Sequence, residues 1–163
     1  MQSQNQHPQQ FSFEFYPPKT DEGAANLQLV HAKLAEQNPE FFSVTFGAGG
    51  STRDKTFDTV VEIQKKGIAA APHLSCVAST KDNIRAILKN YQQHGISKIV
   101  ALRGDLPSGM MSAGEFRYAN ELVAFIRQET GDDFQIHVAA YPEVHPQASS
   151  AAEDFKNFKR KVD

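Results

Sequence analysis

The sequence predicts an α/β fold of about five βα units, carried by a single domain over residues 11–163. Strand-like segments, rich in aromatic and β-branched residues, alternate with segments whose apolar residues recur at helical spacing. The expected strands begin near residues 11, 41, 70, 98 and 135, and spacings of roughly 30 residues suit one βα unit each. Strict alternation indicates parallel strands, so functional side chains are expected at the carboxyl ends of the strands.

The chain begins with a Gln-rich polar tail, residues 1–10, which we expect to be disordered. FSFEFY at residues 11–16 predicts a strand, because aromatic and polar side chains alternate along it. Apolar residues near helical spacing predict a helix over residues 26–34. FFSVTF then predicts a second strand over residues 41–46.

The next helix is expected near residues 53–66, because Ser51 and Asp54 resemble a capping box at its start. AAPHLSCV at residues 70–77 predicts the third strand. The helix that follows, over residues 81–94, has a capping threonine before it and a glycine after it.

The fourth strand is predicted by KIVALRG at residues 98–104, and we expect it to be the most clearly buried one. A helix over 115–127, a strand QIHVAAY over 135–141 and a helix over 151–162 complete the series. This last helix has an apolar stripe, expected to face the core, and a polar row on another face. The stripe contains Ala151, Phe155, Phe158 and Val162, and the row contains Asp154, Asn157 and Lys161.

Composition limits the classes of function. The 163 residues include 17 Lys and Arg and 19 Asp and Glu, and 40% are hydrophobic, which is typical of a globular protein. A pI near 6.3 argues against a main role in binding nucleic acid or anionic membrane. No apolar run approaches the roughly 20 residues of a membrane span, and the start lacks a secretion signal, so we expect a cytoplasmic protein.

Two architectures are built from such units. Five strands in about 150 residues suit an open, doubly wound sheet. A closed eight-stranded barrel needs about 250 residues, so this chain would be only part of one. Length alone therefore favours the open sheet.

Glu14 is a candidate general acid on the first expected strand. Alternation places Ser12, Glu14 and Tyr16 on one face and the neighbouring phenylalanines on the other. An apolar setting favours the protonated carboxyl group, which suits proton donation. A glutamate on the solvated face of an edge strand is an equally favoured interpretation.

RGDLP at residues 103–107 directly follows the apolar fourth strand. Arg103 and Asp105 either pair with each other or contact a ligand, and we favour the ligand because Gly104 allows close approach to the backbone. The loop GAGGST at residues 47–52 lacks the lysine of a P-loop and the third glycine of a dinucleotide fingerprint. A ligand loop and a simple tight turn are about equally favoured there.

The histidines and the single cysteine give weaker indications. His73, His137 and His145 lack the spacing of a metal site, so we expect no metal. His73 lies on a strand and is more typical of a packed residue than of a catalyst. His145 lies in a loop that two prolines stiffen, which is typical of a functional position. Cys76 has no obvious activating partner, and we expect an unreactive core residue.

Six segments carry the most specific patterns of the chain: FSFEFYPPKT, FFSVTFGAGGSTRD, AAPHLSCV, ISKIVALRGDLP, HVAAYPEVHP and DFKNFKRKVD. In their order and spacing, over roughly residues 11–163, they resemble the methylenetetrahydrofolate reductase family. The resemblance implies a (β/α)8 TIM barrel, of which this chain carries about five βα units. It therefore replaces the open sheet that length favours. In the family, further βα units follow the fifth helix.

The resemblance implies a flavoprotein that binds FAD and oxidises NADH or NADPH. Such an enzyme reduces 5,10-methylenetetrahydrofolate to 5-methyltetrahydrofolate by a ping-pong reaction through FAD, in one-carbon metabolism and methionine biosynthesis. By position, Glu14 resembles the general acid that protonates the departing folate nitrogen. Asp105 resembles the acid beside the flavin and the pterin. A homo-oligomer of the complete barrel is also implied.

The resemblance further implies two groups of cofactor contacts. Flavin or nicotinamide contacts are Thr45, Phe46, Ala48, His73, Arg103, Gly104, Asp105, Tyr118, Ala119, Tyr141 and His145. Contacts to the ribose, phosphate and adenine parts are Ala148, Asp154, Asn157, Arg160 and Lys161.

Two other functions stay open on the sequence. The first is a truncated, non-catalytic chain that binds FAD weakly or only assembles with a partner. The second is a flavin-independent barrel transferase that uses folate, which would leave the cluster from Asp154 to Lys161 without a purpose. The choice between NADH and NADPH also stays open.

Overall fold

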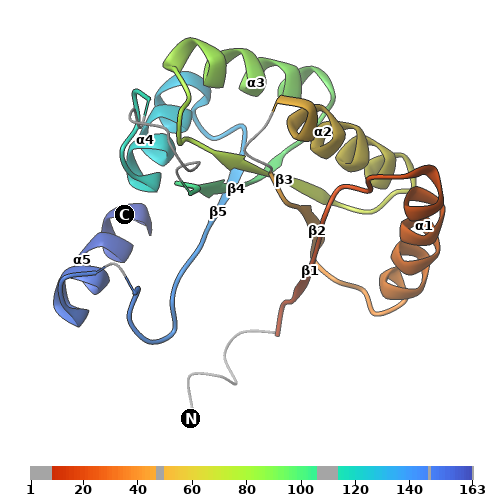
Figure 1. The fold of residues 1–163 in the computed structure, drawn as a ribbon, viewed down its shortest axis with the longest axis horizontal. Coiled ribbons are helices and arrows are strands. Elements are labelled where there is room, and N and C mark those ends of the chain that lie inside the picture. Colours follow the sequence, from red (N-terminus) through yellow and green to blue (C-terminus); the bar gives the residue numbers. More distant parts are fainter. Residues whose placement is uncertain (1–8, 47–49, 106–113, 147, 163) are drawn as a thin grey trace. The chain divides into compact units, whose positions relative to one another are not determined.

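The computed structural model describes residues 9–46, 50–105, 114–146 and 148–162. Within these ranges five strands alternate with five helices along the chain, which confirms the predicted succession of βα units (Figure 1). The chain forms two compact units, unit 1 (Met1–Pro72) and unit 2 (His73–Asp163). None of the described helices is long and apolar enough to cross a membrane.

Unit 1 contains three parallel strands in the order β1-β2-β3. Glu14 of β1 is in register with Ser43 of β2, and Phe42 of β2 with Ala70 at the start of β3. The elements are β1 (Ser12–Phe15), α1 (Asp21–Ala35), β2 (Phe41–Val44), α2 (Gly50–Lys65) and β3 (Ala70–Ser75), which continues into unit 2.

Both helices of unit 1 begin earlier than predicted. α1 begins at Asp21 because the side chain of Thr20 accepts a 3.0 Å hydrogen bond from the main-chain N–H of Gly23, which satisfies one of the free donors of the first turn. α2 begins at Gly50, so Ser51 lies inside the helix. The prediction that Ser51 caps this helix from outside is wrong, because the helix already starts within the glycine-rich segment.

The core of unit 1 includes an imidazole packed among aromatic rings. His31 is the buried residue of α1, and its ring centroid lies 4.4 Å from that of Phe15 and 5.3 Å from that of Phe42. Burial, and to a smaller extent the charge of Lys66, lowers the pKa of His31 to about 4. The face of β1 that carries Ser12 and Glu14 is exposed, which agrees with the interpretation of Glu14 as a residue on a solvated strand face.

Unit 2 contains the rest of β3 and two more parallel strands, in the order β3-β4-β5. Its other elements are α3 (Lys81–Gln93), β4 (Lys98–Leu102), α4 (Ala119–Thr130), β5 (Gln135–Val138) and α5 (Ala151–Val162). The side chain of Thr80 caps α3, and Gly95 follows this helix with a φ of 69°, which confirms the predicted start and end.

The burial of the strands differs from the prediction. All of β3 is buried, whereas β4 alternates, with Ile99 and Ala101 buried and its other residues half-buried. The fourth strand is therefore not the most buried one. α4 begins at Ala119 rather than near 115, because the Glu121 carboxylate caps the helix there by accepting hydrogen bonds from the N–H groups of Arg117 and Tyr118. Glu115 lies before the helix, and its carboxylate accepts a hydrogen bond from the N–H of Lys81.

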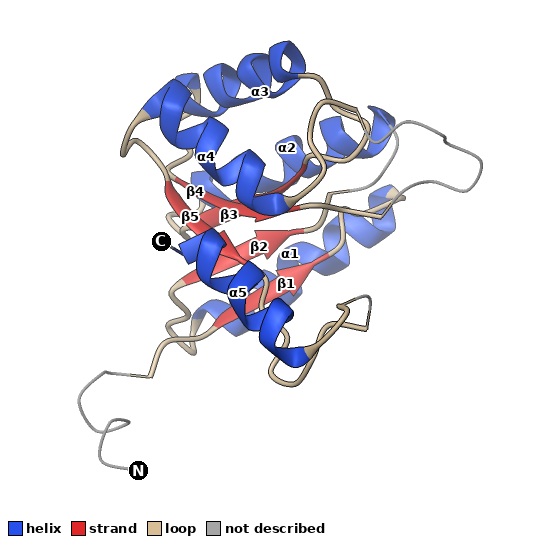
Figure 2. Ribbon diagram, turned by 90° about the vertical axis from the view of Figure 1, so that its left-hand side faces the viewer, coloured by secondary structure: helices blue, strands red, loops and turns tan. Residues whose placement is uncertain are grey.

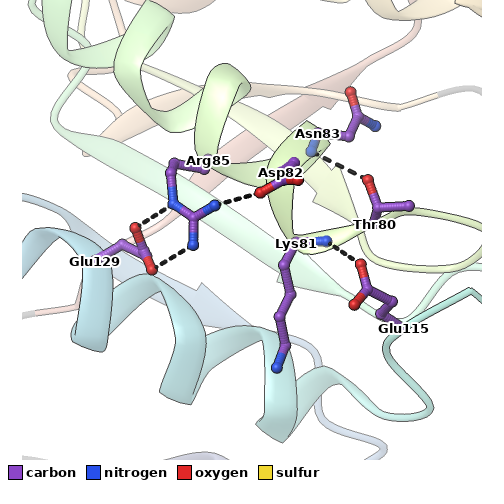
Figure 3. A network of polar contacts seen from close by, with 7 residues as sticks. All are labelled: Thr80, Lys81, Asp82, Asn83, Arg85, Glu115 and Glu129. Atoms are coloured by element: carbon purple, nitrogen blue, oxygen red, sulfur yellow. Dashed lines mark hydrogen bonds and ion pairs between the residues drawn. The ribbon is translucent and has the colours of Figure 1, made fainter.

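α3 and α4 pack side by side in unit 2 (Figure 2). The Arg85 guanidinium joins them by donating hydrogen bonds of 2.6 and 2.9 Å to the Glu129 carboxylate, and it also pairs with Asp82 (Figure 3). The same guanidinium lies 5.5 Å from the centroid of the Phe125 ring. A bidentate pair combined with a cation–π contact holds the two helices in one orientation.

The apolar stripe of α5 is not the core face that the sequence predicts. None of the residues of α5 is buried, and Phe155 and Val162 are 69% and 57% exposed. α5 packs against α4, but helical spacing identifies only which side of a helix is apolar and not what covers it. Part of the stripe faces a cavity instead.

Candidate functional site

A cavity of about 490 Å³ lies in unit 2 at the carboxyl ends of β4 and β5. α5 forms another of its walls, with Phe155 and Phe158 contributing apolar surface. The position matches the expectation that parallel strands gather functional groups at their carboxyl ends. Predicted site residues in its lining are Arg103, Gly104, Asp105, Ala119, Tyr141, His145, Asp154 and Lys161.

A second cavity, of about 640 Å³, adjoins the first. The two share Arg103, Ala119, His145, Asp154 and Lys161 in their linings. The second adds Tyr118, Ala148, Asn157 and Arg160. All predicted cofactor-binding residues of unit 2 except His73 therefore line one or both cavities.

The turn after β4 places Arg103, Gly104 and Asp105 along the cavity. The carbonyl oxygen of Arg103 accepts 2.8 Å hydrogen bonds from the N–H of Val77 and from the hydroxyl of Ser75. Gly104 has a φ of 81°, a conformation that favours glycine. The Nε–H of Arg103 donates to the carbonyl of Gly104 over 3.2 Å, and Asp105 is exposed.

The loop after β5 is joined to the first turn of α5. Oδ2 of Asp154 accepts a 2.9 Å hydrogen bond from the main-chain N–H of His145. The rings of Tyr141 and His145 meet edge to face, with centroids 4.6 Å apart. The N–H of Ala148 donates to the carbonyl of His145 over 2.8 Å. These contacts hold several cavity-lining residues in one arrangement.

Lys161 anchors the other end of α5 to the strand layer. Its Nζ donates a 2.6 Å hydrogen bond to the carbonyl of Ala139, just after β5, and lies 5.5 Å from the Phe158 ring centroid. Partial burial lowers the pKa of Lys161, and the charge of Asp154 opposes this shift. On the next residue, Arg160 donates a 3.0 Å hydrogen bond to Oδ1 of Asn157.

The cavities combine cationic groups with apolar walls. Arg103, Arg160 and Lys161 supply positive charge to the second cavity, while Asp154 and two glutamates that line it limit the net charge. The first cavity has alanines and the α5 phenylalanines on its walls. This arrangement suits a ligand with a flat aromatic part and an anionic part.

Other predicted site residues belong to unit 1 or lie away from the cavities. Glu14 is exposed on β1, so the phenylalanines of that strand do not enclose its carboxyl group. Thr45 follows β2, and its carbonyl accepts a 2.7 Å hydrogen bond from the Thr56 hydroxyl, with Phe46 next to it. His73 is buried in β3. Ala48 lies outside the described residues.

Sequence reasoning missed two kinds of residue at this site. Phe155 and Phe158 line the first cavity, although their spacing predicts a core stripe. Ser75 holds the turn after β4, and its only sequence indication is a small hydroxyl residue at the end of a buried strand. Cys76 is buried, as predicted, and burial raises the pKa of its thiol to about 11.

A protein-family model described as methylenetetrahydrofolate reductase matches residues 1–163. The chain belongs to the methylenetetrahydrofolate reductase family. This finding confirms the resemblance and assigns the five βα units to a TIM-barrel family.

Family members with the same name include proteins from Salmonella typhimurium and Escherichia coli, each a 5,10-methylenetetrahydrofolate reductase. Each is 47% identical over 153 residues, which is 93% of this chain and 50% of the relative. A protein from Oryza sativa subsp. japonica, named a probable methylenetetrahydrofolate reductase (NADH), is 38% identical over 94% of this chain and 28% of its own length. The chain thus spans about half the length of the bacterial relatives.

Proposed function

We propose that this chain supplies the FAD-binding part of an enzyme that reduces 5,10-methylenetetrahydrofolate to 5-methyltetrahydrofolate. One observation carries the proposal. The residues of unit 2 that the family resemblance assigns to FAD come from several separate segments, yet they line two adjoining cavities. Residues brought together only by folding, and sharing one expected ligand, support a common site.

The chemistry of the lining residues fits FAD. The flavin and adenine rings need flat apolar surfaces, which Phe155, Phe158 and the alanines of the first cavity offer. The pyrophosphate needs cationic or N–H donors, which Arg103, Arg160 and Lys161 offer in the second. The two volumes, about 490 and 640 Å³, adjoin and so suit an elongated ligand.

FAD, when bound, would supply the hydride-carrying chemistry of the reaction. The chain's own groups would bind and orient it. Asp105 would place a carboxylate beside the flavin and the folate pterin, where its charge would tune reduction. Glu14, once protonated, would donate its proton to the departing folate nitrogen, which makes the one-carbon unit electrophilic enough to accept hydride.

NADH is the favoured hydride donor. The rice relative is named as an NADH enzyme, and this supports the same donor for the enzyme to which the present chain contributes. The activity belongs to one-carbon metabolism, because its substrate and product are folates that carry a one-carbon unit.

The test is a titration of the 163-residue chain with FAD, followed by flavin absorbance and fluorescence. We expect saturable binding by the native chain. Lys161→Ala should weaken it about tenfold or more, because a charged hydrogen bond and the anchor of α5 are both lost. Lys89, exposed on α3, provides the matched control, and Lys89→Ala should bind FAD like the native chain.

Two results would contradict the proposal. A folded native chain that fails to bind FAD would show that these cavities are not a cofactor site in this chain. Equal losses of FAD affinity in Lys161→Ala and Lys89→Ala would show that FAD binding does not depend on the cavities. The flavin-independent transferase predicts the first of these results.

A further inference from the structure

The carboxyl end of β3 carries a hydroxyl group that contacts the turn after β4. Ser75 is 7% exposed and pairs in register with Leu102, the last residue of β4. Its Oγ–H donates a 2.8 Å hydrogen bond to the carbonyl oxygen of Arg103. The serine thus contacts the segment that lines the first cavity.

The Arg103 carbonyl is held from two sides. The N–H of Val77 also donates to it over 2.8 Å, while the N–H of Cys76 donates to the preceding carbonyl, of Leu102, over 3.1 Å. The Cys76 thiol also contacts this carbonyl, with its Sγ 3.7 Å from the oxygen, but a thiol is a weak donor. Several donors on one carbonyl restrict the rotation of its peptide plane. The Val77 bond is a main-chain contact that continues the strand pairing, so Ser75 supplies the shorter of the two side-chain contacts.

The peptide that follows is oriented by the same contacts. A trans peptide is planar, and its C=O and N–H point in opposite directions. Since the Arg103 carbonyl points toward β3, the N–H of Gly104 points away from β3. On that side of β4 lies β5, whose carboxyl end lines the cavity.

Gly104 fits closely against the serine. Its φ is 81°, and a Cβ at this position would lie 1.9 Å from Oγ of Ser75. The hydroxyl therefore occupies the space that any other side chain would need. Ser75 and Gly104 form a matched pair in which one residue fills the space that the other leaves.

We propose that Ser75 is a positioning residue for the cofactor site. It fixes the Arg103–Gly104 peptide so that the Gly104 N–H, with the flanking Arg103 and Asp105, faces an FAD molecule in the cavity. The inference rests on the proposed function, because it names a residue that acts on the FAD site through the turn.

The experiment compares Ser75→Ala, Ser75→Thr and Ser97→Ala with the native chain. Ser97 is exposed immediately before β4, at its opposite end, and serves as the control. We expect Ser75→Ala to raise the Kd for FAD about fivefold, the scale of one hydrogen bond. It should also shift the visible absorption band of bound FAD. Ser75→Thr keeps the hydroxyl and should restore both properties to within about twofold.

A second measurement reports on the turn without FAD. The backbone amide resonance of Gly104 in a ¹H–¹⁵N NMR spectrum should shift in Ser75→Ala and stay in place in Ser97→Ala. A general packing defect would lower the melting temperature without moving the flavin band selectively. Rescue by threonine therefore separates positioning from packing.

The outcomes separate the inference from the function on which it rests. If the native chain does not bind FAD, both are overturned. If the native chain binds FAD and folded Ser75→Ala has the same Kd and flavin band, only the positioning role is overturned. If Ser75→Ala does not fold, the test of the positioning role uses Ser75→Thr, which keeps the hydroxyl. A folded Ser75→Thr variant with weakened FAD binding overturns the role of the hydroxyl.

Discussion

Asp154 and His145 are joined by a 2.9 Å hydrogen bond, in which the main-chain N–H of His145 donates to Oδ2 of the aspartate. Asp154 lies in the first turn of α5, where a carboxylate also favours the positive end of the helix dipole. His145 lies in the loop after β5 and stacks edge to face on Tyr141. One carboxylate thus holds the helix, the loop and an aromatic wall of the cavity together.

Asp154→Ala removes this acceptor, and we expect it to weaken FAD binding about tenfold. Asp154→Asn keeps an oxygen that can accept the hydrogen bond from His145, so this variant should lose much less affinity for FAD. Fluorescence titration with FAD measures both. Asp132→Ala changes an aspartate that is exposed beyond α4 and provides the control. Two results would contradict the role of this hydrogen bond in FAD binding. One is an Asp154→Ala variant that binds FAD as tightly as the native chain, and the other is an Asp154→Asn variant that loses as much affinity as Asp154→Ala.

Cys76 should be chemically unreactive in the folded chain. Its side chain is fully buried, with Sγ 3.7 Å from the Arg103 carbonyl oxygen and 3.8 Å from that of Tyr118. Burial raises the pKa of the thiol to about 11, so little of the reactive thiolate is present near neutral pH. We expect a disulfide reagent to label this thiol only after unfolding in guanidinium. Rapid labelling of the native chain would contradict the burial of Cys76.

His31 should make the stability of the chain decrease at acidic pH. Its folded pKa of about 4 lies below the 6.5 of a free imidazole, because burial opposes the charged imidazole. The unfolded chain therefore binds the proton first, and stability falls as pH decreases from about 6.5 to about 4. The loss is on the order of 3 kcal/mol.

Urea unfolding at several pH values across this window measures the effect. His31→Phe keeps an aromatic ring among Phe15 and Phe42 and should flatten the pH profile. His94→Phe makes the same substitution at an exposed residue just after α3 and serves as the matched control. Identical profiles for the native chain and His31→Phe would contradict the prediction.

The order of the elements could be predicted from the sequence because local patterns determine it. β2 and β3 are short segments in which apolar residues predominate, and Thr80 and Gly95 mark the ends of α3 through local capping. The contact that Glu115 makes before α4 could not be predicted in this way. Glu115 bonds to the N–H of Lys81, 34 positions away in the sequence, and a local pattern contains no information about such a contact.

The candidate site could be predicted where residue types within a motif carry the chemistry. Arg103, Gly104 and Asp105 follow an apolar strand, and the structure places them on the wall of a cavity. Ser75 could not be predicted, because its partner lies 28 positions away. The core position that helical spacing predicts for Phe155 is wrong, because such spacing identifies an apolar face but does not distinguish a core from a cavity wall.

Gly104→Ala should be more damaging than Gly131→Ala, although both glycines have positive φ, 81° and 57°. Backbone strain, of about 1–3 kcal/mol, is common to both substitutions. At Gly131 a Cβ would meet nothing within 4 Å, whereas at Gly104 it would meet Ser75 Oγ at 1.9 Å. The Ser75 side chain must then move and lose its bond to Arg103, which costs about 1–2 kcal/mol more.

Urea unfolding of Gly104→Ala, Gly131→Ala, Ser75→Ala and the double variant Gly104→Ala/Ser75→Ala measures this difference. In the double variant the hydroxyl that collides with the new Cβ is absent. The double variant should therefore lose less stability than the sum of the losses in Gly104→Ala and Ser75→Ala. Equal losses of stability in Gly104→Ala and Gly131→Ala would show that backbone strain alone determines the cost of these substitutions. Full additivity in the double variant would show that the close fit between Gly104 and Ser75 contributes nothing.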